Sequence, residues 1–187
     1  MDQLDVCYNK LVCLPDSIGD LDVSHNELVC LPDDIGRLVS LKELNASSNR
    51  LYVIPPSFGS LHSLLKLNLS ANELVDIPSS IGNLSQLTEL LISRNFLSSL
   101  PVSIENCASL SWLDISHNSF VKLPVCIGRI SKLDWLNISH NSLTSLPRFI
   151  SSHPSLTTLD VSGNPFSEYK DEFNTDESIH LSSLQPS

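Results

Sequence analysis

Asparagine occurs at seven positions along the chain that are spaced 23 residues apart. These residues are Asn26, Asn49, Asn72, Asn95, Asn118, Asn141 and Asn164. The same apolar frame surrounds each of them, and around Asn72 it reads Leu64-x-x-Leu67-x-Leu69-x-x-Asn72-x-Leu74-x-x-Ile77-Pro78-x-x-Ile81-Gly82-x-Leu84. One unit of this size cannot bury its own leucines, whereas stacked units share a continuous core. The period therefore predicts an elongated stack of similar turns.

Each part of the frame predicts a local structure. Alternating apolar residues such as Leu67 and Leu69 favour a short strand with one buried face. The asparagine is polar but turned inward, so a ladder of amides bonded to backbone groups is expected. A Leu-Pro step, as in Leu100-Pro101, ends the strand, and the Ile-Gly that follows leaves room for about one helical turn.

The frame L-x-x-L-x-L-x-x-N-x-L is typical of leucine-rich repeats. We therefore expect an α/β leucine-rich-repeat solenoid, or horseshoe, with a parallel sheet on its concave face and short 3-10 or irregular turns on its convex face. The repeat domain is expected over residues 1–169, as about eight repeats. Residues 170–187 are rich in acids and serines, which predicts a disordered tail.

The first repeat is shorter than the others. Asn9 and Asn26 are only 17 residues apart. This shortening is explained either by a truncated or mis-spliced coding sequence or by a flattened first turn that acts as a makeshift cap. At the other end Phe166, Tyr169 and Phe173 are expected to cover the last turn of core.

Charge and cysteine content exclude several classes of function. The formal net charge is −10, which disfavours binding to phosphate backbones, so no nucleic-acid partner is expected. No apolar stretch is long enough for a membrane span, and the first residues lack the layout of a signal peptide. The five cysteines form no C-x-x-C pair, which favours reduced thiols and a cytoplasmic protein.

With its second half, as in Leu123-Pro124-x-x-Ile127-Gly128-x-Ile130, the frame resembles the intracellular leucine-rich repeats of three groups. These are the Ras-scaffold family of the SHOC/Sur type, the plant intracellular Ras-group-related proteins, and the junctional proteins of the Scribble type. The resemblance implies a non-enzymatic scaffold in signal transduction whose partner is a small GTPase or a phosphatase. No binding residue of those families is carried over, because the matching positions encode the solenoid and not the partner.

Residues between the buried leucines should be displayed on the concave face. The only two tryptophans, Trp112 and Trp135, occupy the same position in successive repeats and should lie about 5 Å apart. Exposed Trp and Arg are typical of binding hot spots. We therefore predict a partner-binding site made of Trp112, Trp135, Leu91, Arg94, Phe96, His117, His140 and Asp114. The structural alternative is that the two indoles stack and merely cover the strand surface.

Catalysis and metal binding are the weaker interpretations of the same residues. Asp114, Ser116 and His117 have the residue types of a triad, but they lie on one strand with no surrounding pocket. His117 and His140 would need more ligands than an open sheet offers, so no metal and no cofactor are expected.

Two other functions remain open at this point. Sequons at Asn45, Asn68, Asn83 and Asn137 would suit an extracellular receptor or adhesion ectodomain, although three of them arise from the repeat itself. An enzyme-inhibitor type of binder is the third possibility. Acids near the N-terminal end of the concave face would either attract a basic partner or remain solvated; they are Asp5, Asp20, Asp22, Glu27 and Glu43.

Overall fold

The computed structural model describes residues 3–5, 18–166 and 178–180, and residues 3–5 and 178–180 are described by their backbone pairing. The strands in these ranges are β1 (Gln3–Asp5), β2 (Asp20–Asp22), β3 (Glu43–Asn45), β4 (Lys66–Asn68), β5 (Glu89–Leu91), β6 (Trp112–Asp114), β7 (Trp135–Asn137), β8 (Thr158–Asp160) and β9 (Ser178–His180). The short 3-10 helices are η1 (Asp33–Arg37), η2 (Pro56–Ser60), η3 (Ser79–Asn83), η4 (Val102–Asn106) and η5 (Val125–Arg129).

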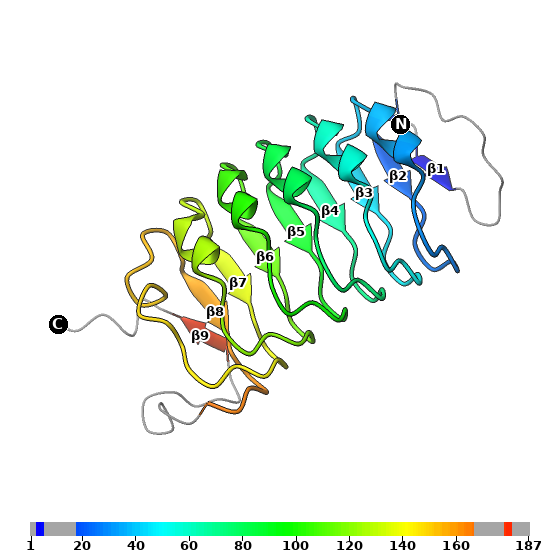
Figure 1. The fold of residues 1–187 in the computed structure, drawn as a ribbon. Coiled ribbons are helices and arrows are strands. Elements are labelled where there is room, and N and C mark those ends of the chain that lie inside the picture. Colours follow the sequence, from blue (N-terminus) through cyan, green and yellow to red (C-terminus); the bar gives the residue numbers. More distant parts are fainter. Residues whose placement is uncertain (1–2, 6–17, 167–177, 181–187) are drawn as a thin grey trace.

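The strands form one sheet in chain order, and β1 to β8 are parallel. From β2 to β8 each strand pairs with the next in the register set by the 23-residue period, so that Leu67 faces Leu90 and Leu90 faces Leu113. Figure 1 shows the strands side by side, with the 3-10 helices stacked in a second row. The predicted leucine-rich-repeat solenoid, with its concave parallel sheet, is confirmed.

The core is one continuous cluster that runs through the stack. It extends from Ile18 to Phe166 and consists almost entirely of the leucines and isoleucines of the frame. Phe58 and Phe120 are its largest fully buried side chains. Cys107 is buried in the same cluster as a small core residue, and its thiol donates a hydrogen bond to the Ile81 carbonyl at 3.3 Å.

Prolines position the 3-10 helices. Each helix follows a proline in extended conformation, as Pro78 does before η3 with φ −65°. The apolar residue in the middle of each helix is buried, and its carbonyl accepts the N–H of the residue after the helix; in η3 these are Ile81 and Leu84. The glycine that follows in η3 has no room for a side chain, because a Cβ on Gly82 would collide with the Ser103 carbonyl oxygen of the next repeat.

The frame asparagines form the expected ladder. Asn95 is 6% exposed, and its Nδ2 donates to the carbonyls of Leu69, Ile92 and Ser93 at 3.0–3.1 Å. Its Oδ1 accepts the N–H of Leu74 from the preceding repeat at 3.0 Å. The other asparagines from Asn49 to Asn164 make the corresponding bonds. Each amide therefore ties its own turn to the turn before it.

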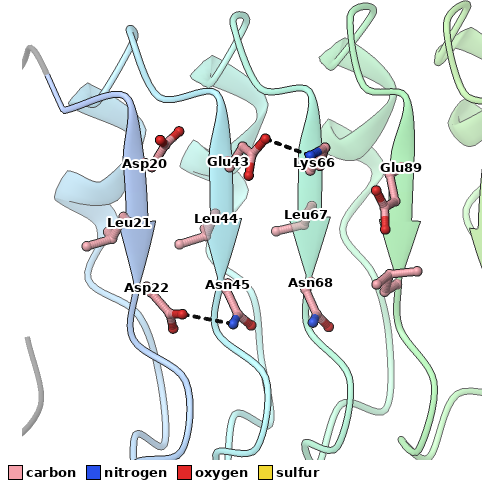
Figure 2. A pocket seen from close by; sticks show the side chains of 11 residues that line it. Asp20, Leu21, Asp22, Glu43, Leu44, Asn45, Lys66, Leu67, Asn68 and Glu89 are labelled. Carbon is pink, nitrogen blue, oxygen red and sulfur yellow. Dashed lines mark hydrogen bonds and ion pairs between the residues drawn. The ribbon is translucent and has the colours of Figure 1, made fainter. Parts of the chain in front are cut away.

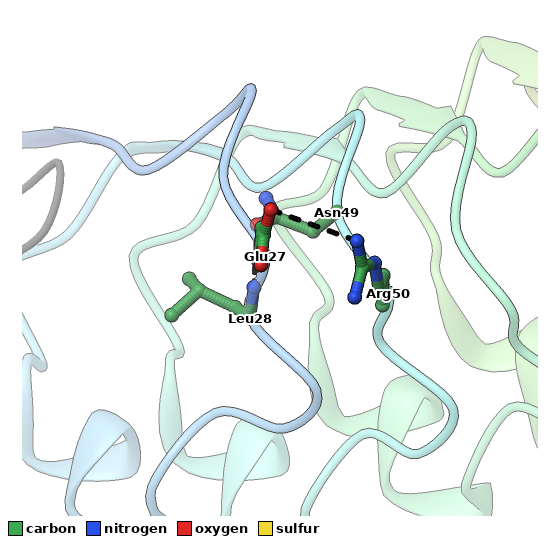
Figure 3. A network of polar contacts seen from close by, with 4 residues as sticks. All are labelled: Glu27, Leu28, Asn49 and Arg50. Atoms are coloured by element: carbon green, nitrogen blue, oxygen red, sulfur yellow. Dashed lines mark hydrogen bonds and ion pairs between the residues drawn. The ribbon is translucent and has the colours of Figure 1, made fainter.

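Figure 3 shows one step of this ladder near the N-terminal end of the described solenoid. Asn49 accepts the N–H of Leu28, while Glu27 and Arg50 beside it form an exposed ion pair at 3.6 Å. An exposed pair of this kind adds little stability, so the amide contact is the one that matters for the stack.

The residue before each ladder asparagine has a left-handed backbone, which the sequence frame does not reveal. These residues are His25, Ser48, Ala71, Arg94, His117, His140 and Gly163, with φ between 51° and 65°. Only the last is a glycine, although this region is strained for other side chains. The hydrogen bonds of the ladder on one side and of the strands on the other hold the chain in this conformation.

The C-terminal strand β9 differs from expectation. Ser178–His180 falls in the segment predicted to be a disordered tail, yet it pairs antiparallel with β8. Pairing there covers the edge that β8 would otherwise leave open. Phe166 is buried, as a cover for the last turn should be. Tyr169, Phe173 and most of the shortened first repeat lie outside the described residues.

We expect Asn95→Ala to lower the free energy of unfolding by about 2–4 kcal/mol, because it leaves the buried N–H of Leu74 without an acceptor and removes one hydrogen bond from each of three backbone carbonyls. Urea denaturation followed by circular dichroism would measure the loss. Asn106→Ala is the matched control, since Asn106 is exposed at the end of η4 and should change stability by at most about 0.5 kcal/mol. Equal losses in the two variants would show that the ladder is not the main constraint.

Candidate protein-binding surface

Trp112 and Trp135 lie next to each other on the sheet face. They are in register on β6 and β7, and their rings stack with centroids 4.0 Å apart and an angle of 14° between planes. Trp112 is 42% exposed and Trp135 is half-buried. The two indoles thus stack, as the structural alternative requires, and they also present aromatic surface to solvent. Stacking and partner binding are therefore compatible.

A row of Asp and Asn residues lies at the C-terminal end of the strands. In six repeats the side-chain Oδ1 accepts the N–H of the serine two residues later, at 2.8–3.2 Å; the residues are Asp22, Asn45, Asn68, Asp114, Asn137 and Asp160. Asp114 therefore holds the turn after β6, a structural role that the sequence analysis did not assign to it.

Leu91 is the one member of this row in the described repeats that has no acceptor to offer. It lies at the end of β5 in register with Asp114, on the strand next to Trp112, and it is half-buried. A turn-stabilising contact made by the other six repeats is absent here, and an apolar side chain lies beside the tryptophan stack instead. A departure from the local rule at one place in a regular fold is a mark of a functional site.

A second aromatic stack lies three residues beyond the strand ends. The rings of His117 and His140 stack with centroids 4.2 Å apart and an angle of 10° between planes. The stack ends at Gly163, where a Cβ would lie 2.5 Å from the Nδ1 atom of His140. Arg94 holds the equivalent position in the preceding repeat and is exposed.

Seven of the eight residues predicted as one site therefore fall into two groups, and Phe96 lies outside both. Trp112, Trp135, Leu91 and Asp114 lie on the strands. Arg94, His117 and His140 lie along the turn that follows, and five residues of extended chain separate the two stacks, about 16 Å at most. Phe96 is 60% exposed and follows the ladder residue Asn95, so it lies beyond the histidine row.

The environment of His117 disfavours its charged form. Partial burial, then the neighbouring His140 and then Arg94 lower the pKa of His117, while Asp114 opposes them weakly. Asp114 makes its hydrogen bond to the backbone of Ser116, and Ser116 is buried. No hydrogen bond links these three residues as a catalytic triad would require in the part of the chain that the structure describes.

A shallow hollow of about 260 Å³ lies on the sheet face N-terminal to the tryptophans (Figure 2). Its charged residues are Asp20, Asp22, Glu43, Glu89 and Lys66, and Leu91 lies at its border. Lys66 forms an ion pair with Glu43 at 2.7 Å, and this hydrogen-bonded contact raises the pKa of Lys66. The hollow thus carries three negative charges that are not balanced within it.

Asp22 remains ionised in this hollow. Partial burial raises the pKa of Asp22, but hydrogen bonds from Ser24 and Asn45 outweigh it, and the net pKa is below its ordinary value.

Metal binding finds no support here, since no group of three or more His, Cys, Asp or Glu side chains in the described ranges is arranged to hold an ion. Within the same ranges, none of the helices has the length and apolarity that a membrane crossing demands.

Comparison with protein families agrees with this architecture. Two family models described as leucine-rich repeat match the chain, one at residues 63–120 and the other at residues 40–61, 132–153 and 155–175. The chain is a leucine-rich repeat protein. Domains of this family are typically non-catalytic protein-binding modules. A search among curated proteins found no match to the sequence.

Solved structures similar to this leucine-rich repeat protein come from bacteria and plants. A leucine-rich repeat protein of Leptospira interrogans is 34% identical with a TM-score of 0.76, over 86% of this chain and 48% of the bacterial one. The ectodomain of the Arabidopsis thaliana receptor kinase GASSHO1/SCHENGEN3 is 37% identical with a TM-score of 0.73, over 81% of this chain and 19% of its own. The ectodomain of the Arabidopsis receptor kinase HAESA is 32% identical with a TM-score of 0.69, over 84% and 28%. This chain spans less than half the length of each.

We expect the imidazole of His117 to titrate below its ordinary pKa of 6.5, and Arg94→Gln to raise that pKa by removing a nearby positive charge. Because the pKa is lowered on folding, the native state binds fewer protons than the unfolded chain. The contribution of His117 to stability therefore falls as the pH drops through 6.5 and levels off below the native pKa. NMR titration of the imidazole resonances measures this, with the distant Arg37→Gln as control. Titration of His117 at or above 6.5 would contradict the prediction.

Proposed function

We propose that this protein is a non-catalytic scaffold that holds a protein partner on its concave face, with the Trp112–Trp135 stack at the centre of the contact. The observation that carries the proposal is the exposed indole pair on a sheet whose core the frame leucines already fill. Tryptophan is the residue type most enriched in binding hot spots, because it combines a large apolar area with few rotatable bonds.

Leu91 supports the same interpretation. Its repeat lacks the side-chain acceptor that six other repeats use to hold the turn. The leucine in its place extends the apolar surface of the tryptophan stack from β6 onto β5. The strands beneath are fixed by the ladder and by their register, so little backbone entropy is lost when a partner binds. A preorganised apolar patch of this kind is what a stable protein contact requires.

We further propose a cytoplasmic location. Cys30 is exposed as a free thiol, and Cys107 and Cys126 are buried free thiols; burial raises the pKa of Cys107 to about 11. Thiols in this state suit a reducing compartment. The resemblance of the frame to Ras-scaffold repeats supports a small GTPase or a phosphatase as the partner class.

A second candidate function is an extracellular peptide-binding domain. Its support is the similarity to the GASSHO1/SCHENGEN3 and HAESA ectodomains, whose structures contain CASPARIAN STRIP INTEGRITY FACTOR 2 and an IDA peptide hormone respectively. The sequons at Asn45, Asn68 and Asn137 give it no added support, because these side chains hold turns on the sheet face and so belong to the repeat. Glycans attached there would obstruct the proposed binding surface, and their presence in the native protein would favour this second candidate.

We expect the double variant Trp112→Ala/Trp135→Ala to weaken partner binding at least about tenfold, because it removes the aromatic centre of the contact. Affinity capture from a cell extract followed by binding measurements on the purified partner tests this. Tyr52→Ala is the control, since Tyr52 is 56% exposed but lies off the strands. Unchanged binding by the double variant would contradict the proposal, as would thermal unfolding at a much lower temperature, which would assign the pair a structural role.

Leu91→Asn should separate stability from binding. Asparagine restores the missing acceptor for the turn, so we expect a gain of about 0.5–1 kcal/mol in unfolding free energy. The same change removes apolar surface beside Trp112 and should weaken partner binding. Denaturation and affinity measured on the same variant give both values. A variant that loses stability while binding normally would show that Leu91 serves the fold and not the partner.

A further inference from the structure

Trp112 uses only one of its two ring faces in the stack with Trp135. The two rings are nearly parallel and belong to neighbouring strands, so the second face of the Trp112 ring is turned toward β5 on the other side. The residue of β5 in register with Trp112 is Glu89. An aromatic face and a carboxylate thus flank the same position of the sheet.

The carboxylate of Glu89 is attracted by the charge of Lys66 but is not paired with it. Among the described residues it makes no ion pair within 4 Å and no side-chain hydrogen bond, although Lys66 lies on the adjacent strand. Lys66 is paired with Glu43 instead, on the side away from Trp112 (Figure 2). Glu89 is half-buried, so its charge is less screened by water than that of a fully exposed side chain.

We propose that the partner inserts an arginine side chain between Glu89 and the free face of Trp112. This inference rests on the proposed function and names the chemistry of the segment that binds. A guanidinium group stacks on an indole face and donates charge-assisted hydrogen bonds to a carboxylate at the same time, whereas a neutral planar group loses the cation–π attraction and the charge-assisted part of those hydrogen bonds.

The charge of the neighbouring hollow fits the same partner. Asp20 and Asp22 both lie on β2, three strands away from β5. The surplus negative charge of the hollow therefore faces the path of a segment that crosses the strands toward Trp112. Leu91 offers an apolar contact at the end of that path. The surface therefore suits a basic segment whose arginine precedes or follows an apolar residue, and the long-range field speeds its encounter with the sheet.

A peptide probe tests the inference on the full chain. We would titrate a fluorescein-labelled peptide of alternating glycine and arginine against the protein, and compare it with the same peptide carrying citrulline, which keeps the shape but removes the charge. Because the chain has only two tryptophans, their two indole N–H resonances report directly on the contact. We expect the arginine peptide alone to shift the Trp112 resonance and to raise the anisotropy.

Variants then locate the site. Glu89→Gln should weaken binding of the arginine peptide about fivefold, since it removes the charge and keeps the shape. Asp160→Asn is the matched control: it removes an acid from the same sheet face on β8, and asparagine occupies the equivalent position in three other repeats. Binding by the control should change by less than about twofold.

The outcomes separate this inference from the proposed function. Equal binding of the arginine and citrulline peptides, or an unaffected Glu89→Gln variant, overturns the arginine site. If the tryptophan double variant still loses its protein partner in that case, the concave scaffold stands and only the chemistry of the partner is wrong. If the double variant keeps its partner, the proposed function fails, whatever the peptide does.

Discussion

The buried amide of the frame asparagine is the interaction on which the solenoid depends. Each amide has two donors and an acceptor to satisfy away from water, and in Asn95 all of them bond to backbone groups of its own repeat and the repeat before. A buried polar group left without partners is costly. The turns after β2 to β8 are therefore fixed in one conformation, even though the residue before each asparagine takes a left-handed backbone.

Rigidity of this kind determines what the surface can display. The leucines fill the core and the asparagines hold the turns. Residues at the remaining strand positions are therefore not needed for the fold, except where an Asp or Asn accepts the N–H of the serine two residues later. Side chains 23 residues apart in sequence lie on neighbouring strands and act together. The Trp112–Trp135 and His117–His140 stacks both arise this way, and the arginine site between Glu89 and Trp112 would follow from the same arrangement.

The repeat frame was sufficient to predict the parallel sheet, the register and the neighbourhood of the two tryptophans. It did not predict that most of the candidate residues separate into two groups, because the period aligns equivalent positions of successive repeats but does not show how far apart different positions lie along the strand and turn. The left-handed row was missed as well: its members include Arg94, Ala71 and His25, which share no side-chain property. Their conformation is imposed by neighbouring hydrogen bonds and leaves no local signal. Strand β9 was missed because its pairing with β8 is antiparallel and lies outside the period.

The sequence by itself determined the fold, since a strict period of apolar residues and asparagines permits only a stack in which each repeat completes the core of the next. It also determined which residues occupy equivalent places. Tertiary structure decided which of these residues do structural work and which are free. Asp114 and Leu91 occupy equivalent positions, yet only Asp114 holds a turn. The absence of a side-chain oxygen in Leu91 is a property of the sequence, but only the folded chain places the Asp114 oxygen where it accepts the N–H of Ser116.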